Sequence, residues 1–348
     1  MNHVVYVLGA GFSAPAGLPV IANFFLKARS QLDCSPTDNP LFLDVFKSID
    51  KLWTVLRYIK VNPENIEEVF SISDMDIDAN VLNRGRLVEF IKRVIEFHTP
   101  AMAASKPAQQ YDRFPDDLRS IWQDSELRDY VTFFACALGL ACHAPTDKPE
   151  GCALSELSAI VEESESAYRF ISLNYDHVVE RAVGFLESTF RVDLRLQLAK
   201  LHGSAEGDIV PPSWTKSISG DLSRDWRLAS DWLRQANEIR ILGYSMPEND
   251  AHFRHLLALS LATSHHLQLI DVICLDDAFK SVRQRYQRIF SFSKLQFYDA
   301  DIKEYFSHFN LGPLDRSGGL ALKAADPEYF HRRFSDVYRA QREAVPRQ

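Results

Sequence analysis

The sequence predicts an α/β protein with a parallel sheet and a helical insertion after the first strand-helix unit. Three observations support this prediction. An apolar run at residues 4–8 ends at a glycine turn, apolar strands alternate with helices over residues 168–298, and residues 41–164 show helical spacing almost throughout. Strands that alternate with helices at this spacing are typical of a parallel sheet covered by helices on both faces.

The first strand ends at Gly9, Ala10 and Gly11. Two glycines allow a tight turn in which backbone N–H groups approach a bound anion. A side chain at Gly11 is expected to collide with that anion. Ser13 is a suitable helix N-cap, and Pro15 is tolerated in a first helical turn. Many α/β sheets hold a dinucleotide pyrophosphate in this way, although a tight turn without a ligand has the same letters.

The insertion follows Pro19 and looks helical. Apolar residues recur there at intervals of three and four, which is typical of amphipathic helices. The expected helices include residues 21–32, the segment 82–95 and residues 118–140, and no clear strand is expected between 41 and 164.

The second half of the chain alternates regularly. Strands are expected at residues 168–173, 194–201, 238–242, 267–275 and 295–298, and helices at residues 176–186, 222–236, 250–262 and 278–290. A Gly318-Gly319 turn and a polar helix from about Pro327 follow. We therefore expect one catalytic domain over residues 1–310, with the insertion at about 41–164, and a C-terminal tail with a helix over residues 311–348.

Composition restricts the class of protein. The 348 residues are 46% hydrophobic and 25% charged, as in ordinary globular proteins. A net charge of −8 without a basic block argues against direct nucleic-acid binding. The longest apolar run, residues 131–142, is too short to cross a membrane, and no secretory signal is recognisable. Five cysteines without a Cys-x-x-Cys pair indicate reduced thiols, so we expect a cytoplasmic protein.

Four expected strand ends carry polar or glycine residues. Each has an ordinary explanation when taken alone: Asn174 or Asp176 can cap a helix, His202 can be a loop histidine, and Gly243 can form a turn. These explanations do not predict all four at the ends of strands in one sheet. Because ligands bind at the carboxyl ends of parallel strands, the coincidence favours a binding site. Its segments are residues 9–13, 174–176, 202–204 and 243–245.

Together these segments resemble the motifs of the sirtuin family. Residues 9–19 look like the family's opening motif, and Leu173-Asn-Tyr-Asp176 is similar to its Gln-Asn-Ile-Asp segment. Leu201-His-Gly203 matches its Leu-His-Gly segment, and Gly243-Tyr-Ser245 resembles its Gly-Thr-Ser segment. Residues 211–214 and 243–250 look like the bacterial sirtuin-like branch found in antiphage defence. The resemblance spans about residues 3–275 and implies a Rossmann-like sheet that binds NAD.

The sequence also departs from the sirtuin deacylases. It lacks their four-cysteine zinc module, and Val20-Ile-Ala-Asn23 stands where they have an Asp-Phe-Arg segment. The resemblance therefore implies an NAD hydrolase (NADase) that needs no zinc, uses NAD as substrate and depletes NAD in antiphage defence. Two alternatives stay open: an NAD-dependent protein deacylase, and a non-enzymatic sensor of NAD or ADP-ribose that regulates a partner.

The resemblance also suggests roles for single residues. Asn174 would hold the ribose and a water molecule, because an amide offers both a donor and an acceptor. Histidine titrates near neutral pH, so His202 would act as general base. Asp176 would orient Asn174 or cap the following helix. The expected NAD-binding residues are Gly9, Ala10, Gly11, Ser13, Gly17, Gly243 and Ser245.

Two expectations concern control of the activity. By family analogy, the protein would form a homo-oligomer and pair with a separate ATPase or other defence-system protein. The stretch from 41 to 164 is too long for a loop, so we expect it to cover the NAD pocket or to form subunit contacts.

Overall fold

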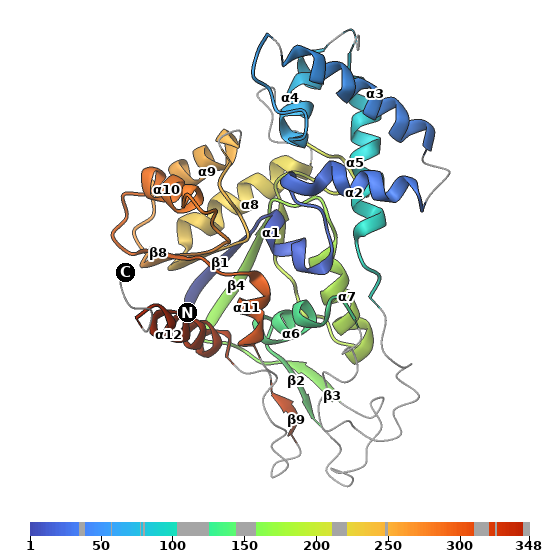
Figure 1. Cartoon of the computed structure of the whole chain (residues 1–348). Coiled ribbons are helices and arrows are strands. Elements are labelled where there is room, and N and C mark those ends of the chain that lie inside the picture. Colours follow the sequence, from blue (N-terminus) through green and yellow to red (C-terminus); the bar gives the residue numbers. More distant parts are fainter. Residues whose placement is uncertain are drawn as a thin grey trace.

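The computed structural model describes residues 1–34, 39–56, 58–76, 78, 81–102, 125–143, 158–210, 221–247, 250–309, 320–323 and 326–343. It is an α/β structure built on a six-stranded sheet with helices on both faces (Figure 1). The predicted fold class is confirmed. Some features named in the sequence analysis lie outside the described residues. They are the first part of the helix expected at 118–140, Cys152, the segment 211–214 and the Gly318-Gly319 turn.

All neighbouring strands of the main sheet are parallel, in the order β5-β4-β1-β6-β7-β8. This is the strand order of a doubly wound Rossmann sheet, in which strands are added first to one side of the first strand and then to the other. The strands are β1 (Asn2–Leu8), β4 (Ser166–Ser172), β5 (Leu198–Lys200), β6 (Glu238–Leu242), β7 (Leu269–Ile273) and β8 (Leu295–Tyr298). The strands predicted at 238–242 and 295–298 have the observed bounds.

Strand β1 lies at the centre of the molecule because both of its faces are apolar. Val4, Tyr6 and Leu8 belong to one core cluster, and Val5 and Val7 belong to the other. All five side chains are completely buried. Alternate residues of a strand point to opposite faces, so this continuous apolar run builds two cores at once.

Helices cover each face of the sheet. The face of Val4 packs against α6 (Arg128–Ala137), α7 (Val178–Phe190), α11 (Ile302–Ser307) and α12 (Pro327–Glu343). The opposite face packs against α8 (Asp221–Gln235), α9 (Ala251–Leu261) and α10 (Ser281–Ile289). None of the helices within the described residues combines the length and apolar character needed to cross a membrane.

The C-terminal helix α12 is tied to the sheet by buried charges. Arg240 on β6 is 1% exposed, and its guanidinium donates to the hydroxyl of Tyr6 at 2.8 Å and to the carboxylate of Glu238 at 2.7 Å. It also contacts the carboxylate of Glu328 on α12. On the same helix, His331 Nε2 lies 2.8 Å from Oδ2 of the buried Asp271.

The described part of the insertion between β1 and β4 is mostly helical, as expected. After the short α1 (Ala10–Ser13) and the 3-10 turns η1 (Ala14–Ala16) and η2 (Ile21–Asn23) come α2 (Phe24–Leu32), α3 (Asn39–Val55), α4 (Ile66–Met75) and α5 (Arg84–His98). Phe90 on α5 joins them, since its ring lies 4.6 Å from that of Phe42 and 6.1 Å from that of Phe25. Figure 1 shows α2 to α5 gathered at one end of the sheet, with α3 and α4 farthest from the strands.

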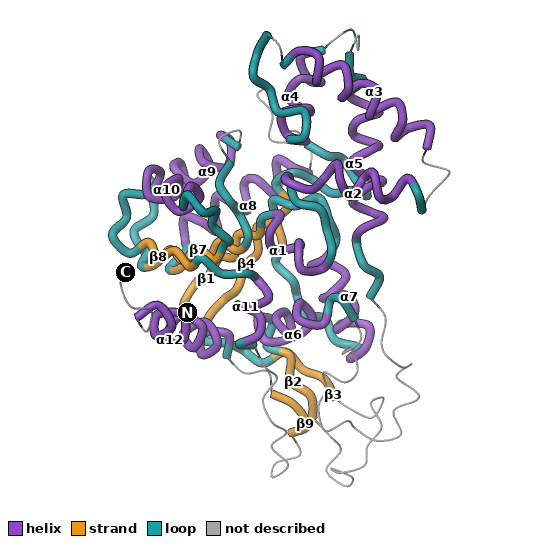
Figure 2. The backbone as a smooth tube through the Cα atoms, viewed as in Figure 1, coloured by secondary structure: helices purple, strands orange, loops and turns teal. Residues whose placement is uncertain are grey.

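The prediction that residues 41–164 contain no strand was wrong. β2 (Leu140–His143) and β3 (Ser158–Val161) pair antiparallel, and β9 (Leu320–Lys323) joins β2 on its other side. Figure 2 shows this small sheet apart from the main one. The apolar run 131–142 contains both the end of α6 and most of β2, and periodicity alone cannot separate a four-residue buried strand from a buried helix.

Candidate functional site

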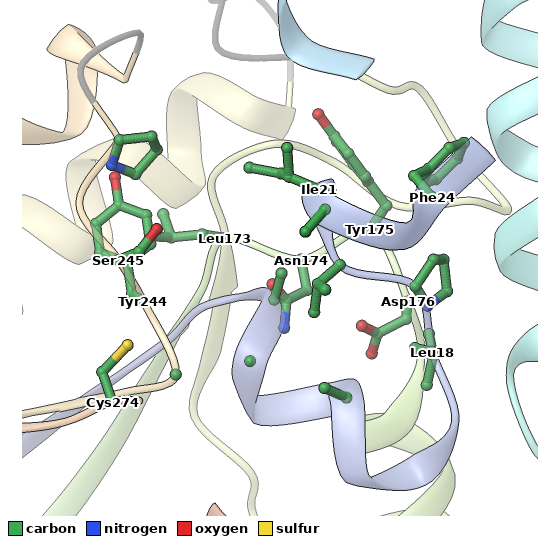
Figure 3. A pocket seen from close by; sticks show the side chains of 18 of the residues that line it. Leu18, Ile21, Phe24, Leu173, Asn174, Tyr175, Asp176, Tyr244, Ser245 and Cys274 are labelled. Atoms are coloured by element: carbon green, nitrogen blue, oxygen red, sulfur yellow. The ribbon is translucent and has the colours of Figure 1, made fainter. Parts of the chain in front are cut away.

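A pocket of about 710 Å³ opens at the carboxyl ends of β1, β4, β5 and β6. This volume is within the usual range for small-molecule sites, and the position is where open parallel sheets bind ligands. The pocket brings together Ala10, Gly11, Asn174, Asp176, His202, Gly243 and Ser245 from the predicted site. In Figure 3, Asn174 lies centrally, with Asp176 on one side and Tyr244 and Ser245 on the other. Helices of the insertion complete the wall, through residues such as Phe24, Ile66, Glu67 and Ile91.

The glycine turn is built against the end of β6. The N–H of Gly9 donates to the carbonyl of Leu242 at 2.9 Å, and that of Gly11 donates to the carbonyl of Gly243 at 2.8 Å. A Cβ at Gly11 would lie 2.8 Å from that same oxygen and 2.9 Å from the Cα of Gly243. Gly243 itself has φ +65°.

The role expected for Gly11 therefore needs correction. Its missing side chain makes room for the backbone of Gly243, and the N–H groups of Gly9 and Gly11 already have protein acceptors. The structure does not place Gly9, Ser13 or Gly17 on the pocket wall. Gly17 lies at the end of η1 with φ +91°, a conformation that favours glycine.

Ser13 is the N-cap residue of η1, as predicted, although its side chain makes no capping hydrogen bond. It is the last residue of α1, for which Gly9 is the N-cap residue. Its buried hydroxyl instead accepts a hydrogen bond from Nδ2 of Asn174 at 3.1 Å. The same nitrogen donates to the carbonyl of Gly9 at 2.9 Å. These two bonds fix the amide plane of Asn174 and leave its oxygen as the atom able to accept from a ligand.

Asp176 stands at the start of α7. Its Oδ1 accepts from the N–H of Val178, the first residue of α7, at 3.0 Å, although the N-cap residue of this helix is His177. Burial raises the pKa of this carboxyl, and the nearby Lys200 ammonium opposes that rise. Lys200 is held by the carboxylate of Glu180 at 2.8 Å. Asp176 also lines the pocket, so both the cap and a ligand contact are open to it.

His202 follows β5 and is almost completely buried. Its Nε2 lies 3.6 Å from Oδ2 of Asp250, a carboxylate that is 2% exposed. The hydroxyl of Tyr244 donates to the same Oδ2 at 2.8 Å, and the N–H of Phe253 donates to Oδ1 at 3.2 Å. Asp250 therefore caps α9 and at the same time sets a negative charge beside the imidazole.

Sequence reasoning missed three acidic members of this pocket, namely Glu67, Asp250 and Asp301. Asp250 was expected only as the first residue of a helix, although its place at the end of the Gly243 segment could have drawn attention to it. Glu67, on α4, also lines the pocket. No motif marks Glu67, because its helix reaches the site only through the packing of the insertion. The expectation that the insertion covers the pocket is supported by these lining residues.

The described residues contain no group of three His, Cys, Asp or Glu side chains placed to hold a metal ion. Among those residues Cys136, Cys142 and Cys274 are buried, Cys34 is exposed, and none of the four forms a disulfide. Cys274 lines the pocket, and burial raises the pKa of its thiol to about 12, so it stays a neutral wall residue at physiological pH.

No family model matches the chain, and no curated protein matches it. Solved structures with some similarity carry sirtuin descriptions. One, "The Structural basis of Sirtuin Substrate Affinity", is 14% identical, and the match covers 88% of this chain and 92% of that chain with a TM-score of 0.35. Another, "Sir2-p53 peptide-NAD+", is 13% identical and covers 87% of this chain and 90% of that chain, also with a TM-score of 0.35.

Proposed function

We propose that the protein is a sirtuin-like NAD glycohydrolase, which converts NAD and water into nicotinamide, ADP-ribose and a proton. The observation that carries this proposal is the convergence of Asn174, Asp176 and His202, three residues from two strand ends, in one pocket of a Rossmann sheet. The residues are distant in the sequence, and the fold brings them to one cavity.

The reaction breaks the bond between the ribose C1′ and the nicotinamide nitrogen. Nicotinamide leaves with the bonding electron pair, so positive charge develops on the ribose as in other glycosyl transfers. Water then adds to C1′ and must lose a proton. The oxygen of Asn174 is the acceptor that would hold this water or a ribose hydroxyl, because the amide nitrogen is fixed by Gly9 and Ser13.

His202 would take the proton, either directly from water or through a ribose hydroxyl. The Asp250 carboxylate at 3.6 Å would stabilise the imidazolium that results, and the Tyr244 hydroxyl holds this carboxylate in place. A buried carboxylate that orients and stabilises a protonated histidine is the arrangement of hydrolytic triads.

The charges of the pocket fit a dinucleotide with one cationic end. Among the described lining residues, Glu67, Asp176, Asp250 and Asp301 are acidic, and Lys303 is the one lysine or arginine. The nicotinamide ring of NAD is positively charged and suits an acidic wall, whereas its pyrophosphate would need Lys303 and backbone donors. We assign the pyrophosphate to the part of the wall formed by Ala10, Ser245 and Lys303. Gly11 and Gly243 also line the cavity, but their N–H groups donate to the carbonyls of Gly243 and Ile273, so they would contact the ligand without donating to it.

The biological part of the proposal rests on the motif resemblance. The protein would deplete NAD in the cytoplasm during antiphage defence, and its catalysis would need no zinc. It would also self-associate and pair with a separate ATPase or other defence protein. The missing zinc module and Asp-Phe-Arg segment favour water over an acyl-lysine peptide as the acceptor.

The decisive experiment follows NAD itself. The purified protein is incubated with NAD alone, and nicotinamide and ADP-ribose are separated by chromatography. Hydrolysis yields both in equal amounts. A deacylase would release nicotinamide only when an acyl peptide is added, and a sensor would bind NAD and leave it intact, so either result would overturn the proposal.

A further inference from the structure

Glu67 is an acidic residue that the inserted helices bring to the pocket. Helix α4 starts after Asn65, whose side chain accepts from the N–H of Glu67 at 2.9 Å and from that of Glu68 at 3.4 Å. Glu67 lines the cavity that Asn174 and His202 also line. Its Oε2 is buried and accepts no hydrogen bond from the part of the chain that the structure describes.

The surroundings of Glu67 are unfavourable for a negative charge. Burial is the main cause that raises the pKa of its carboxyl to about 7, and the charge of Asp250 adds to the rise. Tyr175 and Tyr244, at the ends of β4 and β6, line the same pocket as Glu67, and its negative charge helps to raise the pKa of both hydroxyls. On the same helix, the carboxylate of Glu68 accepts from the N–H of Asn62 at 2.8 Å. The carboxyl of Asp176 differs from that of Glu67, because the nearby Lys200 ammonium opposes the rise in pKa that burial causes.

We propose that Glu67 is a ligand-binding residue, whose carboxylate accepts a hydrogen bond from a ribose hydroxyl of the bound nucleotide. This inference rests on the proposed function and deepens it, because the inserted helices then complete the nucleotide site. It assigns the hydroxyl to the side of the pocket where His202 and Asp250 lie.

The physical reason for this assignment is that Oε2 of Glu67 has no hydrogen-bond donor within the described residues. A buried acceptor without a donor costs free energy, and a ligand hydroxyl would satisfy it. Hydrogen bonds to an ionised carboxylate are stronger than those to a neutral group, so the ligand favours the ionised form. Binding should therefore lower the pKa of Glu67. Below pH 7 the free protein holds a proton there, and binding of the ligand releases it.

The test measures protons released when ADP-ribose binds. ADP-ribose carries the ribose hydroxyls and requires no turnover. Calorimetric titrations in buffers of different ionisation enthalpy are run at pH 6.5 and 8.5 on the wild type, on Glu67→Gln and on the control Glu68→Gln. The wild type and the control should release up to about three-quarters of a proton at pH 6.5 and almost none at pH 8.5.

Glu67→Gln should lose this proton release and, at pH 8.5, bind ADP-ribose about tenfold more weakly, since a neutral amide is a poorer acceptor. Circular dichroism melting verifies that the variant is folded. Unchanged proton release and affinity in folded Glu67→Gln would overturn this inference and leave the proposed function standing. Failure of the folded wild type to bind either ADP-ribose or NAD would overturn the proposed function, and this inference with it.

Discussion

Nε2 of His202 lies 3.6 Å from Oδ2 of Asp250, and both side chains are almost completely buried. The two residues come from the ends of different strands, β5 and β6. Asp250 is held by the Tyr244 hydroxyl and by the first turn of α9, so its position does not depend on a ligand. A preformed carboxylate beside a histidine is suited to a proton-accepting role, because it lowers the cost of forming the imidazolium.

Loss of either partner should therefore reduce turnover more than binding. His202→Ala removes the general base and should lower kcat by about 10²- to 10⁴-fold. Asp250→Asn removes the charge but keeps one oxygen, which can still accept from the N–H of Phe253, so its loss should be smaller than that of His202→Ala. Rates of nicotinamide release, together with NAD affinity by calorimetry, test both expectations. Parental kcat in His202→Ala would exclude His202 as the base.

Asn174 is expected to act in the same step. Asn174→Ala should lower kcat strongly, and the Asn174→Ala/His202→Ala double variant should lose little more than the worse single variant, because both residues serve one event. Ser13→Ala is the matched control. It removes one of the two acceptors of the amide nitrogen and leaves Gly9 to hold it, so its effect should be much smaller. Additive losses in the double variant would mean that the two residues act in separate steps.

How far the sequence predicts this molecule depends on the range of the interactions. The strands at 238–242 and 295–298 were predicted because their apolar runs are bounded by turns and helices close in sequence. β2 and β3 were missed because their pairing joins segments that have no period of their own. Asn174, Asp176 and His202 could be predicted, since strand ends of one parallel sheet must meet at one edge. Glu67 could not, because only the packing of α4 brings it to the cavity.

Substitution of Gly11 tests whether this glycine contacts the ligand or is needed for the packing of the turn. A Cβ at Gly11 would press on the Gly243 backbone, whereas one at Gly17 would meet no atom within 4 Å. Gly11→Ala should cost about 1–3 kcal/mol of stability by overpacking the turn. Gly17→Ala should cost about 1–2 kcal/mol through its positive φ alone and leave the turn intact.

Chemical denaturation gives the stability of both glycine variants, and titration with NAD gives their affinities. Gly11→Ala should impair both stability and NAD binding, because the turn carries Ala10 and the carbonyl of Gly9 that holds Asn174. Gly17→Ala should leave NAD affinity unchanged. A Gly11→Ala protein of parental stability that failed to bind NAD would restore the original expectation that Gly11 contacts the ligand directly.

Glu67 should also change the pH dependence of the free energy of unfolding when no ligand is bound. Its pKa rises from an ordinary 4.5 to about 7 in the folded protein. For an acid whose pKa is higher when folded, the stabilising contribution is present below the unfolded pKa and is lost as the pH rises through the folded one. The wild type should thus lose stability relative to Glu67→Gln between pH 4.5 and about 7, by at most about 3 kcal/mol, and the difference should level off above that.

Urea denaturation at half-unit pH intervals measures the free energy of unfolding of both proteins. Glu68→Gln is the control for removal of a charge from the same helix turn. Parallel curves for the wild type and Glu67→Gln across this range would mean that the carboxyl is hydrated in solution and does not face a closed pocket.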